Sequence, residues 1–117
     1  MATGAGRVWV GLQARAVNED PEPSVPDLFR FDPSDGSGDF FDYGLRPQET
    51  KSANMIYATD DAAWVKSEDP FLMRIDPVSG EVNWIVTSDR GSGVIVISDG
   101  TLWMTLWRDN AVLRIDL

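Results

Sequence analysis

The sequence predicts an all-β fold in which one unit of short strands occurs about three times. Each unit carries a tryptophan within a β-favouring stretch, and these are Trp9, Trp64 and Trp103. Each unit then carries an Arg-apolar-Asp triplet, and the triplets end at Asp32, Asp76 and Asp116. The triplets lie about 40 residues apart, a period typical of solenoids and propellers when each unit holds several strands. No segment keeps a helical apolar period with capping residues, so we expect almost no helix.

The composition limits the classes of function. A chain of 117 residues with a hydrophobic fraction of 43% can bury the core of a single domain. Its net charge of -9 opposes binding to nucleic acid or to an anionic membrane, because both require a basic patch. A cationic ligand, a metal ion or simple solubility fits this charge better. The chain has no histidine and no cysteine, which removes the commonest general base and all thiolate chemistry and leans against an enzyme.

The chain shows no feature of export or membrane insertion. Residues 1–7 lack a basic start followed by an apolar run, and no later segment has the length needed to cross a bilayer. If the chain is complete as given, we expect a cytoplasmic protein. If it is a fragment, the compartment of its parent stays open.

The first unit is predicted to hold two strands separated by a long loop. Residues 7–12 and 28–31 are rich in β-favouring side chains. Residues 14–27 between them carry three prolines and several acidic side chains, which remove backbone donors and resist burial. Because the other two units have a tight connection at this place, we interpret residues 14–27 as an insertion.

A turn of the pattern Asp-Pro-x-x-Gly follows the triplet in the first two units, at residues 32–36 and 76–80. In such a turn the Asp side chain accepts a backbone hydrogen bond, Pro presets its own φ, and Gly takes a positive φ. The turn joins antiparallel strands. We therefore predict outer strands at residues 39–43 and 81–86.

Inner strands are predicted at residues 54–58 and 93–97, each followed by a tight turn. One hairpin position before the tryptophan strands is expected to take left-handed geometry, and it is occupied by Gly6, Asp61 and Gly100. Residues 94–97 (Val-Ile-Val-Ile) show no polar alternation. We expect this strand to be innermost and buried on both faces.

Together these elements describe a four-stranded up-and-down sheet, the blade of a β-propeller. With strands A to D counted from the centre, we predict a single partial propeller over residues 1–117. Its first blade has strands B–D at about 7–45, its second is complete at about 53–87, and its third has strands A–C at about 93–117. Rings close with about four to eight blades, so three leave the ring open. Either the chain is the C-terminal portion of a larger propeller, which we favour, or copies associate as a homo-oligomer to complete a ring.

The repeat resembles those of streptogramin B lyase-like proteins and of NHL and YVTN-type propellers. The resemblance is carried by residues 110–116 (Asn-Ala-Val-Leu-Arg-Ile-Asp) and by residues 71–82, which continue the motif as Arg-Ile-Asp-Pro-x-x-Gly-x-Val. It implies a propeller fold. It also implies a lyase that needs a histidine, acidic residues and a divalent metal, but this chain has no histidine to take that role. The Thr-Glu expected after the tryptophan strands is replaced by Val10-Gly11, Val65-Lys66 and Met104-Thr105.

A binding surface is predicted where the units differ, because the recurring tryptophans and arginines are better explained as packing and pairing residues. In a propeller of this topology, the B–C loops and D–A connections emerge on one face, which we call the loop face. Trp107 breaks the repeat and lies beside Arg108, Asp109 and Asn110, so an aromatic ring, a cation and hydrogen-bonding groups could face a ligand there. The other candidate residues on the loop face are Lys66, Glu68, Asp69, Asp89 and Arg90.

Three functions remain open on these residues. The preferred one is a non-catalytic binding module that contacts a small molecule or a protein through the loop face. The second is part of a lyase or lactone-hydrolase-like enzyme whose catalytic residues lie in missing blades, and the third is a non-functional propeller fragment. We assign no catalytic residue and no cofactor. Calcium or magnesium could take oxygen ligands from the carboxylates of Asp32, Asp35, Asp39 and Asp42. The spacing of these residues matches no calcium-binding loop.

Overall fold

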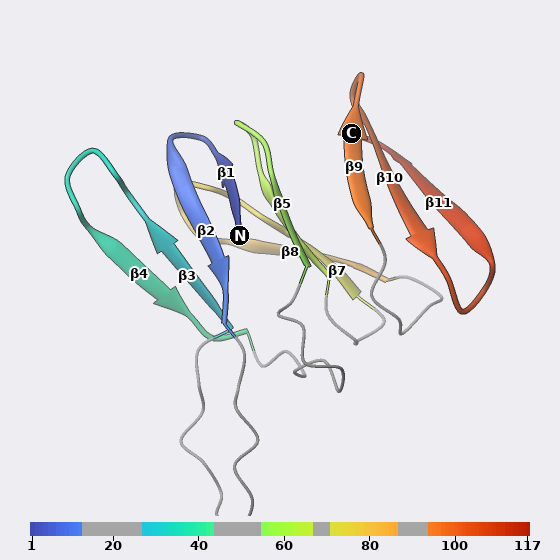
Figure 1. The fold of residues 1–117 in the computed structure, drawn as a ribbon, viewed down its shortest axis with the longest axis horizontal. Helices are drawn as coiled ribbons and strands as arrows, with labels where there is room; N and C mark the ends of the chain where they lie inside the picture. Colours follow the sequence, from blue (N-terminus) through green and yellow to red (C-terminus); the bar gives the residue numbers. More distant parts are fainter. Residues whose placement is uncertain (13–26, 44–54, 67–70, 87–93) are drawn as a thin grey trace, which may run out of the picture.

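The computed structural model describes residues 1–12, 27–43, 55–66, 71–86 and 94–117. These residues form strands in three antiparallel sheets and no helix, as the sequence predicts (Figure 1). The first sheet consists of β1 (Ala2–Gly4), β2 (Arg7–Gly11), β3 (Leu28–Phe31) and β4 (Gly38–Phe41). The second consists of β5 (Met55–Ala58), β6 (Ala63–Lys66), β7 (Phe71–Ile75) and β8 (Val82–Val86). The third consists of β9 (Ile95–Ser98), β10 (Thr101–Leu106) and β11 (Ala111–Asp116).

Each sheet is an up-and-down meander whose turns are specified locally. In the turn between β7 and β8, the carboxylate of Asp76 accepts hydrogen bonds from the backbone N–H of Val78 at 2.9 Å and of Ser79 at 2.7 Å. Gly80 ends this turn with a φ of 76°, which only glycine adopts without strain. The turn between β3 and β4 is built in the same way, with Gly36 at a φ of 78°. The predicted Asp-Pro-x-x-Gly turns are confirmed.

The first sheet has one strand more than the sequence predicts. We expected this unit to begin at Arg7, but β1 pairs with β2 in the register Thr3↔Val8. Three small residues carry no apolar period, so the strand cannot be recognised locally. It is specified by packing instead, because Gly4 lies against the second sheet so closely that a Cβ there would come within 2.4 Å of the carbonyl oxygen of Thr59.

We predicted a left-handed residue in the turn before each tryptophan strand. This prediction is confirmed for the first and third sheets and is wrong for the second. Gly6 and Gly100 have φ values of 68° and 70°, but Asp61 is not among the residues with positive φ. The turn before β6 is closed differently, by a hydrogen bond from the N–H of Thr59 to the carbonyl of Ala62 at 2.9 Å. The hydroxyl of Thr59 also accepts from the N–H of Ala62, which fixes the turn without a left-handed residue.

The expectation that residues 94–97 are buried on both faces is also wrong. In β9 only one face is covered, since Ile95 is buried while Val96 is 49% exposed. The strand lies at the edge of the third sheet and pairs with β10 alone among the described strands. The apolar run of β9 therefore has one face that packs in the core, with Ile95, and one face that is partly exposed, with Val96.

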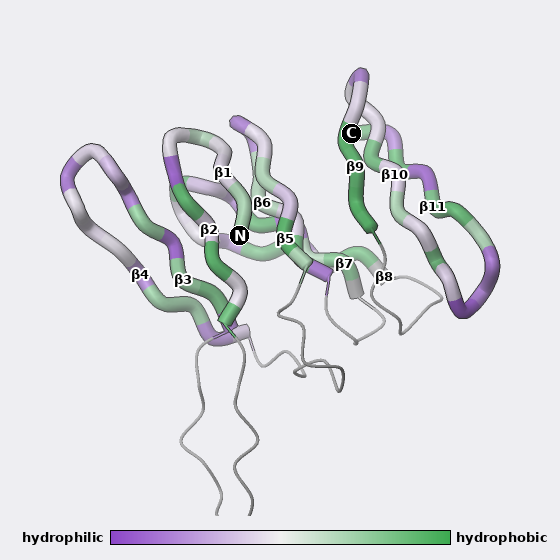
Figure 2. Tube along the Cα trace, in the orientation of Figure 1, coloured by the Kyte–Doolittle hydropathy of each residue, from purple (hydrophilic) through white to green (hydrophobic). Residues whose placement is uncertain are grey.

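Two apolar clusters hold the sheets together, one on each face of the second sheet. Figure 2 shows apolar stretches along the strands of all three sheets and hydrophilic residues at the turns. The cluster between the first and second sheets has at its centre Trp9, Leu28, Ala63, Val65, Met73 and Ile75. The cluster between the second and third sheets has at its centre Ala62, Trp64, Leu72, Ile95, Leu102, Met104 and Leu106. Leu72 and Met73, adjacent in β7, thus serve opposite clusters, as expected of neighbours in a strand.

The repeated tryptophan and arginine lie on the same face of each sheet, which we call the forward face; the opposite face is the backward face. The strand register pairs Trp9 with Arg30 and Trp64 with Arg74. The forward face of the first sheet packs on the backward face of the second, and the forward face of the second packs on the backward face of the third. The third pair, Trp103 and Arg114, also shares a face, and there Trp103 is 42% exposed.

Candidate functional site

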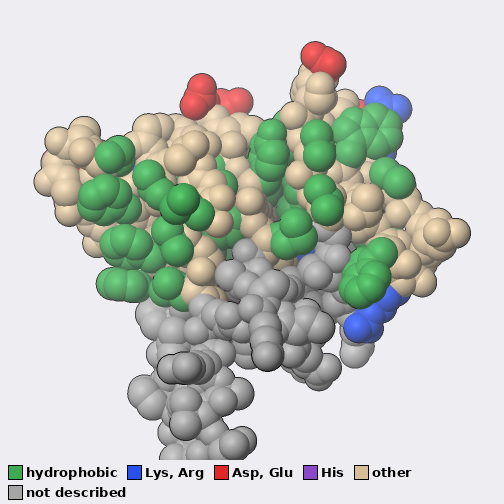
Figure 3. Space-filling view, in the orientation of Figure 1, with side chains coloured by type: hydrophobic (Ala, Val, Ile, Leu, Met, Phe, Trp, Pro, Cys, Tyr) green, Lys and Arg blue, Asp and Glu red, His purple; other side chains and the backbone are tan. Residues whose placement is uncertain are grey.

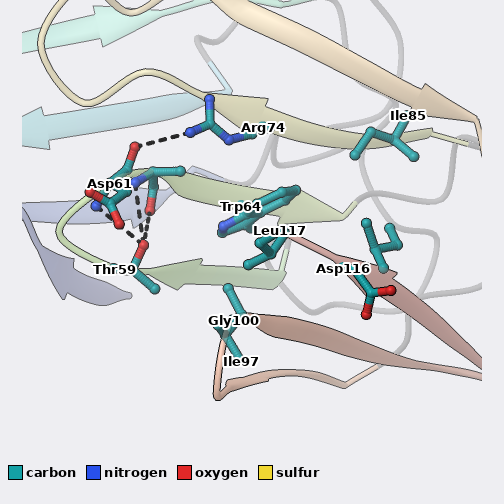
Figure 4. A pocket seen from close by; sticks show the side chains of 11 residues that line it. Thr59, Asp61, Trp64, Arg74, Ile85, Ile97, Gly100, Asp116 and Leu117 are labelled. Atoms are coloured by element: carbon teal, nitrogen blue, oxygen red, sulfur yellow. Dashed lines mark hydrogen bonds between the residues drawn. The ribbon is translucent and has the colours of Figure 1, made fainter.

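A cavity of about 710 Å³ lies between the second and third sheets, and we call it the inter-sheet cavity (Figure 4). Its volume falls in the range of sites that take small ligands or short peptide segments. Its apolar lining comes from Ala62, Ile85, Ile97, Ile115 and Leu117. Its polar lining comes from Thr59, Asp61, Trp64, Arg74 and Asp116, with Gly100 at the turn between β9 and β10.

The turns that precede β6 and β10 form one side of this cavity. The turn before β6 is held by Thr59, as described above. The turn before β10 is held by a hydrogen bond from the N–H of Leu117 to the carbonyl of Gly100 at 2.8 Å. Both turns are therefore held by hydrogen bonds within their own sheets, so the side of the cavity that they form does not depend on a ligand.

Arg74 is the cation among the residues that line the cavity, and most of its N–H donors have no acceptor among the described residues. A guanidinium has five N–H donors in a fixed planar arrangement. Among the described residues, Arg74 donates one long hydrogen bond, of 3.4 Å, to the carbonyl oxygen of Asp61. Its guanidinium carbon lies 5.8 Å from the ring centroid of Trp64, a cation–π distance that orients the group over the indole. The remaining donors can take oxygen acceptors from a ligand.

The indole of Trp64 forms part of the wall of the same cavity. Its side chain is 2% exposed, and its Nε1 atom is buried with no hydrogen-bond partner among the described residues. Because this nitrogen is not accessible at the cavity surface, Trp64 offers a ligand the apolar surface of its ring and no hydrogen bond. Trp9 has the same unpaired nitrogen in the first sheet, so this feature does not mark a site.

Two carboxylates balance the cation of the cavity. Asp61 precedes β6, and Asp116 ends β11, where it forms an ion pair with Arg114 at 2.9 Å. A nearby carboxylate, Asp76, has its pKa held below its usual range by hydrogen bonds from the backbone N–H groups of Ser79 and Val78, with Arg74 as a smaller cause. The cavity can thus offer hydrogen-bond donors at Arg74 and acceptors at its carboxylates. This set suits a ligand that carries both hydrogen-bond acceptors and a positive charge.

The predicted loop-face residues between β10 and β11 lie away from this cavity. The turn between β10 and β11 contains Trp107, Arg108, Asp109 and Asn110, all exposed, with Trp107 at 65%. This turn follows the end of β10, whereas the cavity adjoins its beginning. Asn110 has a φ of 50°, so its position also has a conformational reason, because asparagine tolerates left-handed geometry.

The other predicted residues are divided between the core and the part of the chain outside the description. Lys66 is fully buried at the end of β6 and is not exposed on a surface. Glu68, Asp69, Asp89 and Arg90 lie outside the described residues, as do residues 14–26 of the predicted insertion. A binding site on the loop face therefore stays a prediction.

Two of the four carboxylates considered for calcium form ion pairs in the structure. Asp32 forms an ion pair with Arg7, and Asp39 forms one with Arg30 at 2.6 Å. Within the described ranges, no group of three or more potential metal ligands lies together.

The described ranges also contain no helix long and apolar enough to cross a membrane.

Sequence reasoning missed the inter-sheet cavity because its polar residues belong to the repeat. Trp64 and Arg74 have counterparts in the first sheet, so the pattern indicates packing at both places. What distinguishes Arg74 is the absence, among the described residues, of the carbonyl acceptors that Arg30 has. No feature within a single unit could have indicated that difference.

Comparison of the chain with family models, with curated proteins and with solved structures finds no match to any of them. The argument for function therefore rests on the geometry of the described residues.

Proposed function

We propose that the sheets are blades of a β-propeller and that the chain is a non-catalytic binding module. Its ligand is an extended peptide segment, taken at the edge of the third sheet. The propeller is supported by the side-by-side arrangement of the sheets, each presenting a Trp–Arg face to the next (Figure 1). Propellers are built from four-stranded blades placed radially in this way.

One comparison carries the peptide proposal. Between the first and second sheets, Arg30 donates hydrogen bonds to the carbonyl oxygens of Pro77 at 2.9 Å and Val78 at 3.2 Å. These carbonyls belong to the turn that leads into the outer strand β8. Arg74 holds the same place in the second sheet but faces the inter-sheet cavity, with one long hydrogen bond. It is positioned to donate hydrogen bonds to the backbone carbonyls of a peptide.

The edge of β11 supplies the second half of such a site. In the first two sheets, the third strand pairs with an outer fourth strand, β4 or β8. In the third sheet β11 pairs with β10 alone among the described strands. A strand edge with unpaired backbone groups can take an added strand from a ligand, whose main chain supplies the hydrogen bonds.

The lining defines the chemistry of the peptide. Alternate side chains of an added strand would point toward the cluster that contains Leu113 and Ile115, so they should be apolar. A turn beside this strand would bring two carbonyl oxygens to Arg74, next to the ring of Trp64. A basic side chain would suit Asp61 and Asp116, and the net charge of -9 favours it further.

A synthetic peptide with the sequence of residues 76–86 and Lys in place of Glu81 is the most direct probe, because it copies the outer strand and turn of the second sheet and supplies the basic side chain. Titration of ¹⁵N-labelled protein should shift the side-chain N–H resonance of Trp64, and calorimetry should give a saturable affinity. The variant Arg74→Ala should weaken binding roughly tenfold, the loss expected for a charge-assisted hydrogen bond. Arg108→Ala, in the exposed turn at the other end of β10, is the matched control and should bind normally.

Two outcomes would contradict the proposal. One is the absence of saturable binding by a protein that melts cooperatively. The other is equal binding of a scrambled peptide of the same composition, since a hydrogen-bonded strand with a turn depends on the order of its residues.

A further inference from the structure

Among the described residues, nothing covers one apolar face at each end of the row of sheets. On the backward face of the first sheet the apolar side chains are Val8, Val10, Phe29, Phe31 and Phe40. On the forward face of the third sheet they are Val96, Trp103 and Val112. Phe40 is 64% exposed, and Figure 3 shows hydrophobic side chains gathered over the first sheet and again over the third. Apolar patches of this kind mark association surfaces.

The two end faces differ in type, one being a forward face and the other a backward face. Two contacts inside the molecule show how a forward face packs on a backward face. A forward face carries a Trp–Arg pair, as at Trp9 with Arg30. The backward face that receives it carries aliphatic residues at four fixed register positions. In the second sheet these are the pairs Ala63↔Ile75 and Val65↔Met73. In the third sheet they are Leu102↔Ile115 and Met104↔Leu113.

The uncovered backward face has the same four positions. In the first sheet they are the pairs Val8↔Phe31 and Val10↔Phe29. The uncovered forward face has the same Trp–Arg pair, with the guanidinium carbon of Arg114 at 5.6 Å from the ring centroid of Trp103. The two end faces are therefore complementary to each other by the rule that the internal contacts follow.

We propose that two copies of this chain associate head to tail, with the forward face of the third sheet of each copy on the backward face of the first sheet of the other. One molecule cannot join its own ends, because the first and third sheets lie at opposite ends of the row (Figure 1). Two copies supply six sheets, a number within the range of about four to eight at which such rings close. A head-to-tail contact that closes gives a ring and not a filament.

The first internal contact also predicts a polar contact in this assembly. Arg30 donates to the carbonyls of Pro77 and Val78 in the turn of the next sheet. Pro33 and Ser34 hold the same places in the turn between β3 and β4. Arg114 of one copy should therefore donate to the carbonyls of Pro33 and Ser34 of the other copy.

Sedimentation equilibrium of the full chain tests the assembly directly. We expect a dimer at micromolar concentration. Its dissociation constant should fall as salt is added, because each copy carries a net charge of -9 and salt screens their repulsion. A protein that stays monomeric at all concentrations, or that forms open polymers, would overturn the proposal.

Two variants and their mixture test the direction of the contact. Trp103→Glu blocks the forward face and Phe31→Glu blocks the backward face, so each variant alone should be monomeric. Mixing them leaves one intact contact, and a dimer with one copy of each should form. Val78→Glu is the control, since Val78 is 84% exposed in a turn outside both faces, and it should dimerise normally.

Each variant must first melt cooperatively with a native circular dichroism spectrum. If Phe31→Glu does not fold, Phe40→Glu takes its place on the same face. A dimer that survives the backward-face variants but not Trp103→Glu would show a symmetric contact between forward faces and overturn the proposal. Two folded variants that do not combine on mixing would overturn it as well.

Discussion

Two contacts join the three sheets, one between the first and second sheets and one between the second and third. Their apolar cores are similar, but the hydrogen bonds around those cores differ. Both bury a tryptophan under an arginine, and both contain an aliphatic side chain from β7. In the first contact Arg30 donates to two turn carbonyls and pairs with Asp39. In the second contact Arg74 makes one long hydrogen bond and lines a cavity.

Further ties close the first contact. The hydroxyl of Tyr43 donates to the carbonyl of Gly80 at 3.0 Å, and the ring of Phe41 lies against the same glycine. The backbone N–H of Ala5 donates to the carboxylate of Asp60 at 3.2 Å. Apolar burial is thus sufficient to bring two sheets together, while hydrogen bonds from the turns decide whether the gap between them is filled. This difference places the candidate site at the second contact.

The largest expected effect comes from filling the space at Gly80, where the first contact is tightest. A Cβ at Gly80 would lie 2.8 Å from the ring of Phe41, at a φ of 76°. Gly80→Ala should cost about 1–2 kcal/mol for the left-handed backbone and about 1–3 kcal/mol more for displacing the ring. Gly36→Ala is the matched control, because its φ is 78° and nothing lies within 4 Å of its Cβ. Denaturant unfolding should show the larger loss at Gly80; equal losses would mean that the contact with Phe41 does not constrain the turn.

A smaller effect should separate the two arginines. Arg30→Ala removes two hydrogen bonds to carbonyls and one ion pair, so the free energy of unfolding should fall by about 1.5–3 kcal/mol. Arg74→Ala removes one long hydrogen bond and a cation–π contact, and it should cost less than about 1 kcal/mol. Urea unfolding of both variants checks the order. If Arg74→Ala were the more destabilising change, Arg74 would be a structural residue and the open site would lose its basis.

The smallest effect concerns Tyr43 and appears at alkaline pH. Burial raises the pKa of Tyr43 to about 12 from an ordinary value of 10.0. A raised pKa means that the fold favours the neutral phenol, so its stabilising contribution is present below pH 10 and is lost as the pH rises through about 12. Tyr43→Phe should cost about 0.5–1.5 kcal/mol at neutral pH through the lost hydrogen bond.

Ultraviolet titration of the phenols measures this pKa. The wild-type protein should show a tyrosine component that ionises late, and Tyr43→Phe should remove that component. A wild-type protein without a late component would show that the ring of Tyr43 is solvated and does not close the first contact.

The sequence was sufficient for those parts of the fold that neighbouring residues specify. The Asp-Pro-x-x-Gly turns, the tryptophan strands and the near absence of helix follow from local preferences and from a period, and the structure has them. It failed where a distant contact decides. β1 is held by its pairing with β2 and by the approach of Gly4 to Thr59, and the turn before β6 uses the side chain of Thr59 where a left-handed residue was expected.

The candidate site shows the same division. The sequence by itself determined that each unit carries a tryptophan strand followed by an Arg-apolar-Asp triplet, because these are local patterns that recur with a period. Only the tertiary structure decided which arginine is satisfied, because the acceptors of Arg30 are 47 and 48 positions away in the chain. Hydrogen bonds across such separations depend on how whole sheets pack. The repeated motif is the same in both units, although the next sheet supplies acceptors to Arg30 and leaves a cavity beside Arg74.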